Sequence, residues 1–172
     1  MGKYLVKDLI NSFQYIPLFL GLWIFVLLIL LCLNKKKIKQ GEQKIRVYET
    51  ASLLAYLGIM IMLTFWSRES GSVTKIDLHI GSSLKINNRN DAMFMENVLL
   101  FIPYGFFVGW YKRWKYCLWR GGVVGCITSL MIEVLQLLTG RGVFQIDDII
   151  TNTLGCIIGV FFYIGIKSIK RK

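Results

Sequence analysis

Long apolar runs constrain this sequence more than any other feature. Ile16 to Leu33 carries no charged side chain, and four similar runs follow, at about Tyr48–Trp66, Ala92–Tyr111, Trp119–Leu138 and Asp147–Ile166. About 20 mostly apolar residues in an α-helix cross the ~30 Å hydrocarbon layer of a bilayer. The composition agrees, because 55% of the residues are hydrophobic. The sequence therefore predicts an all-α, polytopic membrane helix bundle with about five transmembrane helices.

The basic residues lie mainly between the apolar runs. The net charge of +11 would suggest a nucleic-acid partner in a soluble chain. Here fourteen of the 21 Lys and Arg residues fall within 34–47, within 111–120 and after 166. Positive residues in short loops mark the cytoplasmic side. We therefore predict a multi-pass protein of the cell membrane with its amino terminus outside and its carboxyl terminus in the cytoplasm, and no nucleic-acid partner.

Two regions are predicted on this basis. Residues 1–90 form a two-span region with a cytoplasmic basic linker and an outer polar loop, and residues 91–172 form a three-helix core with a basic cytoplasmic tail. Residues 1–15 read as an amphipathic leader, and lysines rather than a cleavage site follow the first run, so that run stays in the membrane. Glu49 is expected to snorkel at the cytoplasmic end of its span. In the polar loop, alternating Val73, Ile76, Leu78 and Ile80 suggest a short strand, and NNRND at 87–91 suggests a turn.

Acidic residues inside the later runs are the main functional signal. An acid at the centre of a membrane helix costs roughly 2.5–3.5 kcal/mol, so such residues are usually functional. Under the predicted topology, the unusual polar residues all lie near the outer ends of their helices. This arrangement predicts an outward-facing polar pocket. Its candidate catalytic residues are Glu96, Glu133 and Asp148, and its candidate substrate-binding residues are Asn97, Gln136, Arg141, Asp147, Asn152 and Arg68.

Helical spacing places small and polar residues on common faces. One stripe contains Asp148, Asn152, Gly155 and Gly159, and a second contains Gly122, Cys126, Ser129, Glu133 and Gln136. Gly105 and Gly109 add a GxxxG spacing, which permits close helix approach. Pro103 is expected to free the carbonyl of Leu99.

The predicted pocket has an excess of acids. Glu96, Glu133, Asp147 and Asp148 face Arg141, together with Arg68 if that side chain reaches the pocket. Either one acid stays protonated, with Glu133 the deepest, or a cation or ligand amine completes the site. A purely structural interpretation remains open, in which Arg141 pairs with Asp147 or Asp148 while Gln136 and Asn152 form interhelical hydrogen bonds.

Cysteine and histidine residues indicate no metal site and no cofactor. Cys32, Cys117, Cys126 and Cys156 lie in or at the ends of predicted spans without a CxxC pair, which favours a packing role. His79 lies in a polar loop without a second ligand nearby and is expected to be solvated.

The later part of the chain contains a set of polar, glycine, proline and aromatic residues at fixed spacings, namely Asn97, Phe101, Ile102, Pro103, Gly105, Glu133, Gln136, Gly140, Arg141, Phe144, Asp147, Asp148, Asn152, Thr153, Gly155 and Gly159. This set resembles the signature of the VanZ-like family. The resemblance covers about Asp91 to Ile166, and it implies a small multi-pass bacterial membrane protein. The family is named for a member associated with low-level resistance to the glycopeptide teicoplanin. Gln145 departs from the pattern, since family members often have an acid there.

Three functions follow as hypotheses. The first is an envelope protein that alters glycopeptide susceptibility, with a pocket that binds a membrane lipid, a lipid-linked cell-wall precursor or the drug. The second is an intramembrane acid–base enzyme acting on an envelope lipid or lipid-linked substrate, although no established catalytic motif supports it. The third is a transporter or channel subunit, which would require an oligomer because five spans without a repeat make a poor transporter alone.

Overall fold

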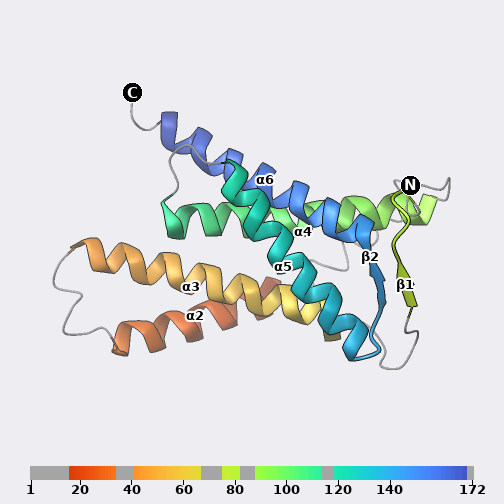
Figure 1. Ribbon diagram of the computed structural model, residues 1–172. Coiled ribbons are helices and arrows are strands. Elements are labelled where there is room, and N and C mark those ends of the chain that lie inside the picture. The colour runs from red at the N-terminus through yellow and green to blue at the C-terminus, as the bar shows by residue number, and fades with distance from the viewer. Residues whose placement is uncertain (1–15, 34–40, 67–74, 82–87, 114–117, 170–172) are drawn as a thin grey trace.

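The chain folds into an all-α bundle with one small sheet at its end (Figure 1). The computed structural model describes residues 16–33, 41–66, 75–81, 88–113 and 118–169. This confirms the predicted fold class. The helices are α2 (Ile16–Leu33), α3 (Gly41–Ile61) with its π-helical continuation η1 (Met62–Trp66), α4 (Asn88–Lys112), α5 (Leu118–Leu138) and α6 (Ile146–Ile169), and the strands are β1 (Lys75–Asp77) and β2 (Val143–Gln145).

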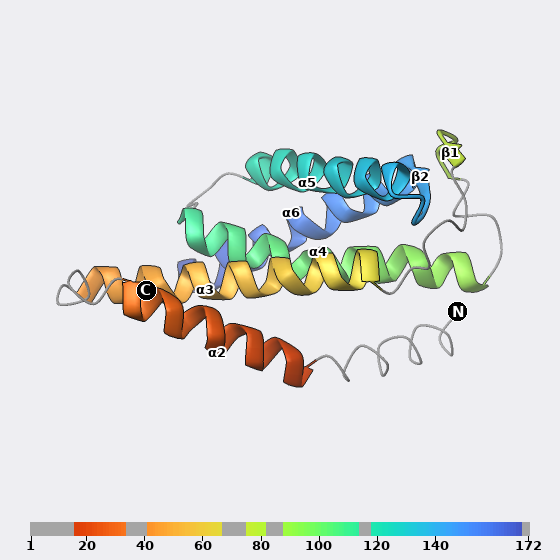
Figure 2. The ribbon, with the colours of Figure 1, turned by 90° about the horizontal axis from the view of Figure 1, so that it is seen from below.

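Most of the helices are membrane spans by length and composition. Within the described residues, four helical segments are long and apolar enough to cross a bilayer, namely Ile45–Phe65, Met93–Lys112, Leu118–Leu138 and Ile146–Ile169. In α2, the apolar helical segment is Leu20–Leu33, which is shorter than each of these four spans. Helix α2 packs antiparallel against α3, where Trp23 Nε1 donates to Ser52 Oγ at 3.1 Å (Figure 2).

Two helices begin earlier than the apolar runs suggest. Helix α3 begins at Gly41, inside the basic linker, because polar residues can continue a helix beyond the bilayer. Helix α4 begins at Asn88, so the predicted turn at NNRND is wrong for residues 88–91. Asn and Asp are favourable in the first turn of a helix as well as in turns, because their side chains can bond the open backbone N–H groups. The leader at 1–15 lies outside the described residues.

Helices α4 and α6 make the closest contact in the bundle, and they run parallel to each other. Gly105 lies against the backbone carbonyl of Cys156, Gly155 against that of Val98, and Gly159 against that of Ile102. A side chain at any of the three would collide with backbone. The predicted close packing through these glycines is therefore confirmed.

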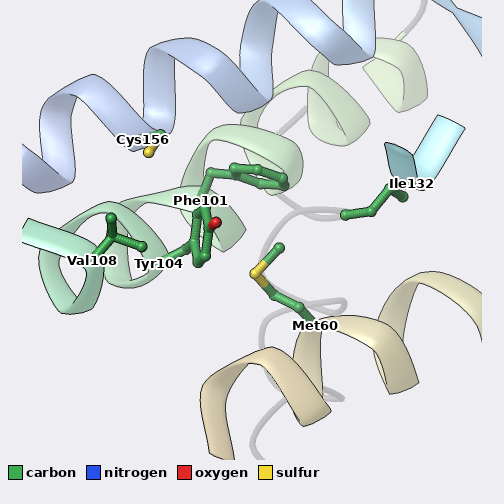
Figure 3. Packing of buried hydrophobic residues seen from close by; sticks show 6 residues of the cluster. All are labelled: Met60, Phe101, Tyr104, Val108, Ile132 and Cys156. Carbon is green, nitrogen blue, oxygen red and sulfur yellow. The ribbon is translucent and has the colours of Figure 1, made fainter. Parts of the chain in front are cut away.

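A hydrophobic cluster fills the space between α3, α4, α5 and α6. Figure 3 shows Met60 pointing from α3 and Ile132 from α5 toward the rings of Phe101 and Tyr104 on α4. Tyr56 of α3 donates to the carbonyl oxygen of Leu100 at 2.6 Å. This bond lies one residue beyond the Leu99 carbonyl that Pro103 leaves without a helical donor. The remaining members of the drawn cluster are Val108 and Cys156.

The two strands form a parallel pair at one end of the bundle (Figure 1). Lys75 pairs with Val143, Ile76 with Phe144 and Asp77 with Gln145. The predicted strand is confirmed at Ile76 only, because β1 ends at Asp77, Leu78 lies after it, Ile80 lies in a turn and Val73 is outside the described residues. Strand β2 was not predicted. Its three residues carry no alternating pattern long enough to be detected. The pair closes the end at which α5 finishes and α6 begins, so it brings the loop at residues 75–81 to the predicted polar site.

Candidate functional site

Three carboxylates are buried where α5, α6 and the sheet meet. Glu133 is 2% exposed, Asp147 is 6% exposed and Asp148 is 7% exposed. Glu133 lies in the second half of α5, and the two aspartates occupy the first turn of α6. Asp147 and Asp148 also benefit from the helix N-terminus, where the macrodipole favours negative charge. The structure thus places these predicted residues at one end of the bundle.

Each strand segment supplies a backbone amide to one of these carboxylates. The amide of Gln145, the last residue of β2, donates to Glu133 Oε2 at 3.0 Å. The amide of Gly81, four residues after β1, donates to Asp147 Oδ1 at 2.8 Å. Gly81 has a φ of +84°, a conformation that glycine adopts without strain. The sheet therefore covers the acidic residues and binds two of them directly.

Asn152 joins α6 to α5 deep in the bundle. Its Nδ2 donates to Ser129 Oγ at 2.8 Å, and both residues are buried. Asn152 Oδ1 is also buried, and it accepts no hydrogen bond from any residue that the structure describes. A buried acceptor of this kind is suited to a group that donates a hydrogen bond.

The side chains of Gln136 and Arg141 bind the backbone of η1, the π-helical end of α3. Gln136 Nε2 donates to the carbonyl oxygen of Thr64 at 3.1 Å, and Arg141 Nη1 donates to that of Phe65 at 2.7 Å. Both carbonyls lie in η1, where the helix ends and its last carbonyls lack helical partners. The two side chains therefore connect the α5 end to the η1 end.

The contacts of Arg141, Gln136 and Asn152 test the purely structural interpretation, in which Arg141 pairs with an aspartate and the two amides link helices. The backbone at 136–141 forms a Schellman turn, with Arg141 N bonded to Gln136 O at 2.9 Å and Gly140 N to Leu137 O at 3.2 Å. Among the described residues, no ion pair links Arg141 to Asp147 or Asp148, so that expected pairing is wrong. The turn directs Arg141 toward η1 instead. The interhelical hydrogen bonds expected of Gln136 and Asn152 are present.

Glu96 and Asn97 approach the site from α4 and are half-buried. The contact of Val98 with Gly155 places them level with the turn of α6 that carries Asn152. The described contacts assign no ligand role to either residue, so their role stays a prediction. Arg68 lies outside the described residues.

The α5 stripe differs from the expected one at its amino-terminal half. Gly121 and Gly125 are buried against α6, whereas Gly122 is half-buried and Cys126 is exposed. Residues 121, 125, 129 and 133 form an i+4 row, which is inclined to the helix axis. Helix α5 crosses α6 at an angle (Figure 1), so its contact follows this row rather than a line parallel to the axis.

Glu49 lies near the opposite end of the bundle and is a residue that sequence reasoning misplaced. It is 2% exposed, and its Oε1 lies 3.7 Å from Nε of Arg113 at the end of α4. The expectation of a snorkelling side chain is therefore wrong. The basic residues that follow α4 could have indicated that Glu49 is buried, since a buried acid needs a cation nearby.

Over the described residues, no three His, Cys, Asp or Glu side chains are grouped so that they could hold a metal ion. Cys32 and Cys126 are exposed and Cys156 is buried, each as a free thiol, and His79 is exposed.

Together these features define a membrane helix bundle with a buried polar cluster, covered by a two-stranded sheet, at one end. The chain belongs to the VanZ/LLP1 family, whose model matches residues 18–168. The match begins in α2, so it extends well beyond the region from Asp91 in which the family pattern was recognised. Protein VanZ of Enterococcus faecium is 24% identical over 129 residues, which cover 69% of this chain and 74% of that protein. No solved structure matches the chain significantly.

Proposed function

We propose that this protein acts in the bacterial cell envelope and lowers susceptibility to glycopeptide antibiotics of the teicoplanin type. In this proposal, the polar end of the bundle faces outward. It binds a membrane lipid, a lipid-linked cell-wall precursor or the drug itself.

The observation that carries the proposal is the burial of Glu133, Asp147 and Asp148 at one end of a membrane bundle. Burying acids in a membrane protein is costly, and helix packing alone could use Ser or Asn at lower cost. Membership in the VanZ/LLP1 family supports a role in the envelope.

The chemistry of the site favours a ligand rich in hydrogen-bond donors. The carboxylates and Asn152 Oδ1 are acceptors, and Asn152 Oδ1 accepts nothing from the described residues. Amino and hydroxyl groups of a glycosylated or lipid-linked molecule would complement such a site.

Gene deletion and complementation test this proposal. Cells lacking the gene receive the wild type, Glu133→Gln or Asp148→Asn, and their susceptibilities to teicoplanin and to vancomycin are measured. We expect deletion to increase teicoplanin susceptibility, and we expect the two amide variants to fail to restore resistance although they reach the membrane in normal amounts.

Glu49→Gln is the matched control, because it removes an equally buried carboxylate at the opposite end. It should restore resistance in proportion to its abundance. Unchanged susceptibility to both drugs on deletion would contradict the proposal. Mass spectrometry of lipids and wall precursors from null, wild-type and Glu133→Gln cells tests the enzymatic alternative, which requires a species that accumulates in the null and the variant alike.

A further inference from the structure

The segment after β1 exposes three large apolar side chains. Ile76 is 56% exposed, Leu78 is 59% exposed and Ile80 is 77% exposed, although all three lie in a connection between two membrane helices. They alternate with Lys75, Asp77 and His79. The chain is a strand only as far as Asp77 and turns at Ile80 and Gly81, so the three apolar side chains are exposed along a short segment that ends in this turn.

The sheet register fixes the position of this segment relative to the membrane spans. Ile76 lies beside Phe144, and the amide of Gly81 binds Asp147 in the first turn of α6. Residues 76–81 therefore run alongside the point at which α6 begins its membrane span, Ile146–Ile169. An apolar segment at this level lies near the boundary between water and hydrocarbon.

The neighbouring helices already present apolar surface to lipid at the same level. Leu138, at the end of α5, and Ile150, in the second turn of α6, are both exposed. Ile76, Leu78 and Ile80 add three more exposed apolar side chains at this end of the bundle. A soluble loop would not normally keep three such side chains in water.

We propose that the exposed side chains of Ile76, Leu78 and Ile80 insert into the lipid bilayer at this end of the bundle, with the acyl chains near the headgroup boundary as their partner. Insertion anchors the segment, and the anchored segment keeps the Gly81 amide on Asp147. The bilayer thereby stabilises the cover over the acidic residues. This inference is independent of the proposed role in drug susceptibility.

Spin labelling of the full chain in liposomes of phosphatidylethanolamine and phosphatidylglycerol tests the insertion. Labels are placed at Leu78→Cys and Ile80→Cys, with Lys75→Cys and His79→Cys as controls, after the four native cysteines are replaced by Ala. We expect collisions with oxygen to exceed those with a water-soluble nickel chelate at 78 and 80, and the reverse at 75 and 79. Dominance of the nickel chelate at 78 and 80 would overturn the proposal. Spin–spin broadening at these positions would also overturn it, because it would identify a second copy of the chain as the occupant.

A second measurement avoids the cysteine replacements. Hydrogen–deuterium exchange is followed for the peptide that contains Gly81 in the native-cysteine chain in the same liposomes. We expect exchange to become about ten-fold faster or more in Leu78→Asp/Ile80→Asp, since two apolar anchors are lost. Lys75→Asp/His79→Asp should exchange at the wild-type rate. Equal exchange in the two double variants would contradict anchoring by lipid.

Discussion

Single residues set the distance between the two most closely packed helices. Gly105, Gly155 and Gly159 each lie against a backbone carbonyl of the partner helix. Their spacing was readable from the sequence because membrane helices use small residues for close approach. The small residues by which α5 packs against α6 were predicted less well. Gly121 and Gly125 are buried against α6, whereas Gly122 is half-buried beside Ile157 and Cys126 is exposed, because the crossing angle of two helices cannot be derived from one helix alone.

Gly159→Ala should destabilise the bundle. Its new methyl group would collide with the carbonyl of Ile102, which is backbone and cannot rotate away. Overpacking of this kind typically costs about 1–3 kcal/mol. The midpoint of thermal unfolding in detergent is the measurement. Gly165→Ala is the matched control, since nothing lies within 4 Å of the added atom. An equal effect of the two substitutions would contradict the described contact.

Asn152 and Ser129 should be coupled in stability. Their hydrogen bond links α6 to α5 away from water. Comparable bonds between membrane helices contribute about 0.6 kcal/mol on average and up to roughly 1.7 kcal/mol. We therefore expect Asn152→Ala, Ser129→Ala and the double variant to give a positive coupling of this size in a double-mutant cycle. Strictly additive effects would show that the bond contributes nothing to stability.

At the scale of elements, local sequence was sufficient for the helices and insufficient for the sheet and for η1. The apolar runs predicted every described helix, because the length of a span depends only on its own residues. The pairing of Ile76 with Phe144, in contrast, joins segments far apart in the chain. The same limit applies to Arg141, whose bond to Phe65 requires α5 to end beside η1. From the sequence alone, an ion pair between Arg141 and a nearby aspartate, Asp147 or Asp148, is the simpler expectation.

Arg141→Met should loosen the contact between α5 and η1. The substitution keeps an apolar stem of similar length and removes the donor to the Phe65 carbonyl. A hydrogen bond from a charged group contributes about 1.5–3 kcal/mol. We expect faster proteolysis near η1 and a lower unfolding midpoint in detergent. Arg120→Met serves as the control, because Arg120 is exposed and its guanidinium lies 5.7 Å from the ring centre of Trp119. A control that loses as much stability would contradict a specific role for the bond.

At the scale of the whole molecule, opposite charges separate along the bundle. The buried acids of α5 and α6 lie at the end closed by the sheet. Arg113, Arg46 and Lys167 lie at the other end, around the buried Glu49. Sequence predicted that the acids of α5 and α6 lie at one end of the bundle, because the position of each acid along its apolar run can be read directly. The prediction for Glu49 was wrong, because its cationic partner Arg113 lies just after α4 and cannot be identified from the sequence around residue 49.

The charge separation predicts the orientation of the protein in the membrane. The basic end should face the cytoplasm and the sheet end should face outward, since positive residues are retained on the inner side. Fusions of alkaline phosphatase after residue 79 should therefore be active, and fusions at the carboxyl terminus should be inactive. Fusions of green fluorescent protein at the carboxyl terminus should fluoresce. The opposite pattern would place the polar cluster inside and would remove the basis for an external ligand.

The side of the membrane on which the amino terminus lies shows whether α2 crosses the bilayer. An 18-residue helix rises about 27 Å, close to the ~30 Å of the hydrocarbon layer. Its antiparallel packing on α3 favours a full crossing. With the basic end in the cytoplasm, a full crossing predicts five spans and an external amino terminus. We expect an epitope tag at the amino terminus to be removed by protease added to intact spheroplasts, whereas a carboxyl-terminal tag is protected. Protection of both tags would show that α2 does not cross the membrane and that the protein has four spans.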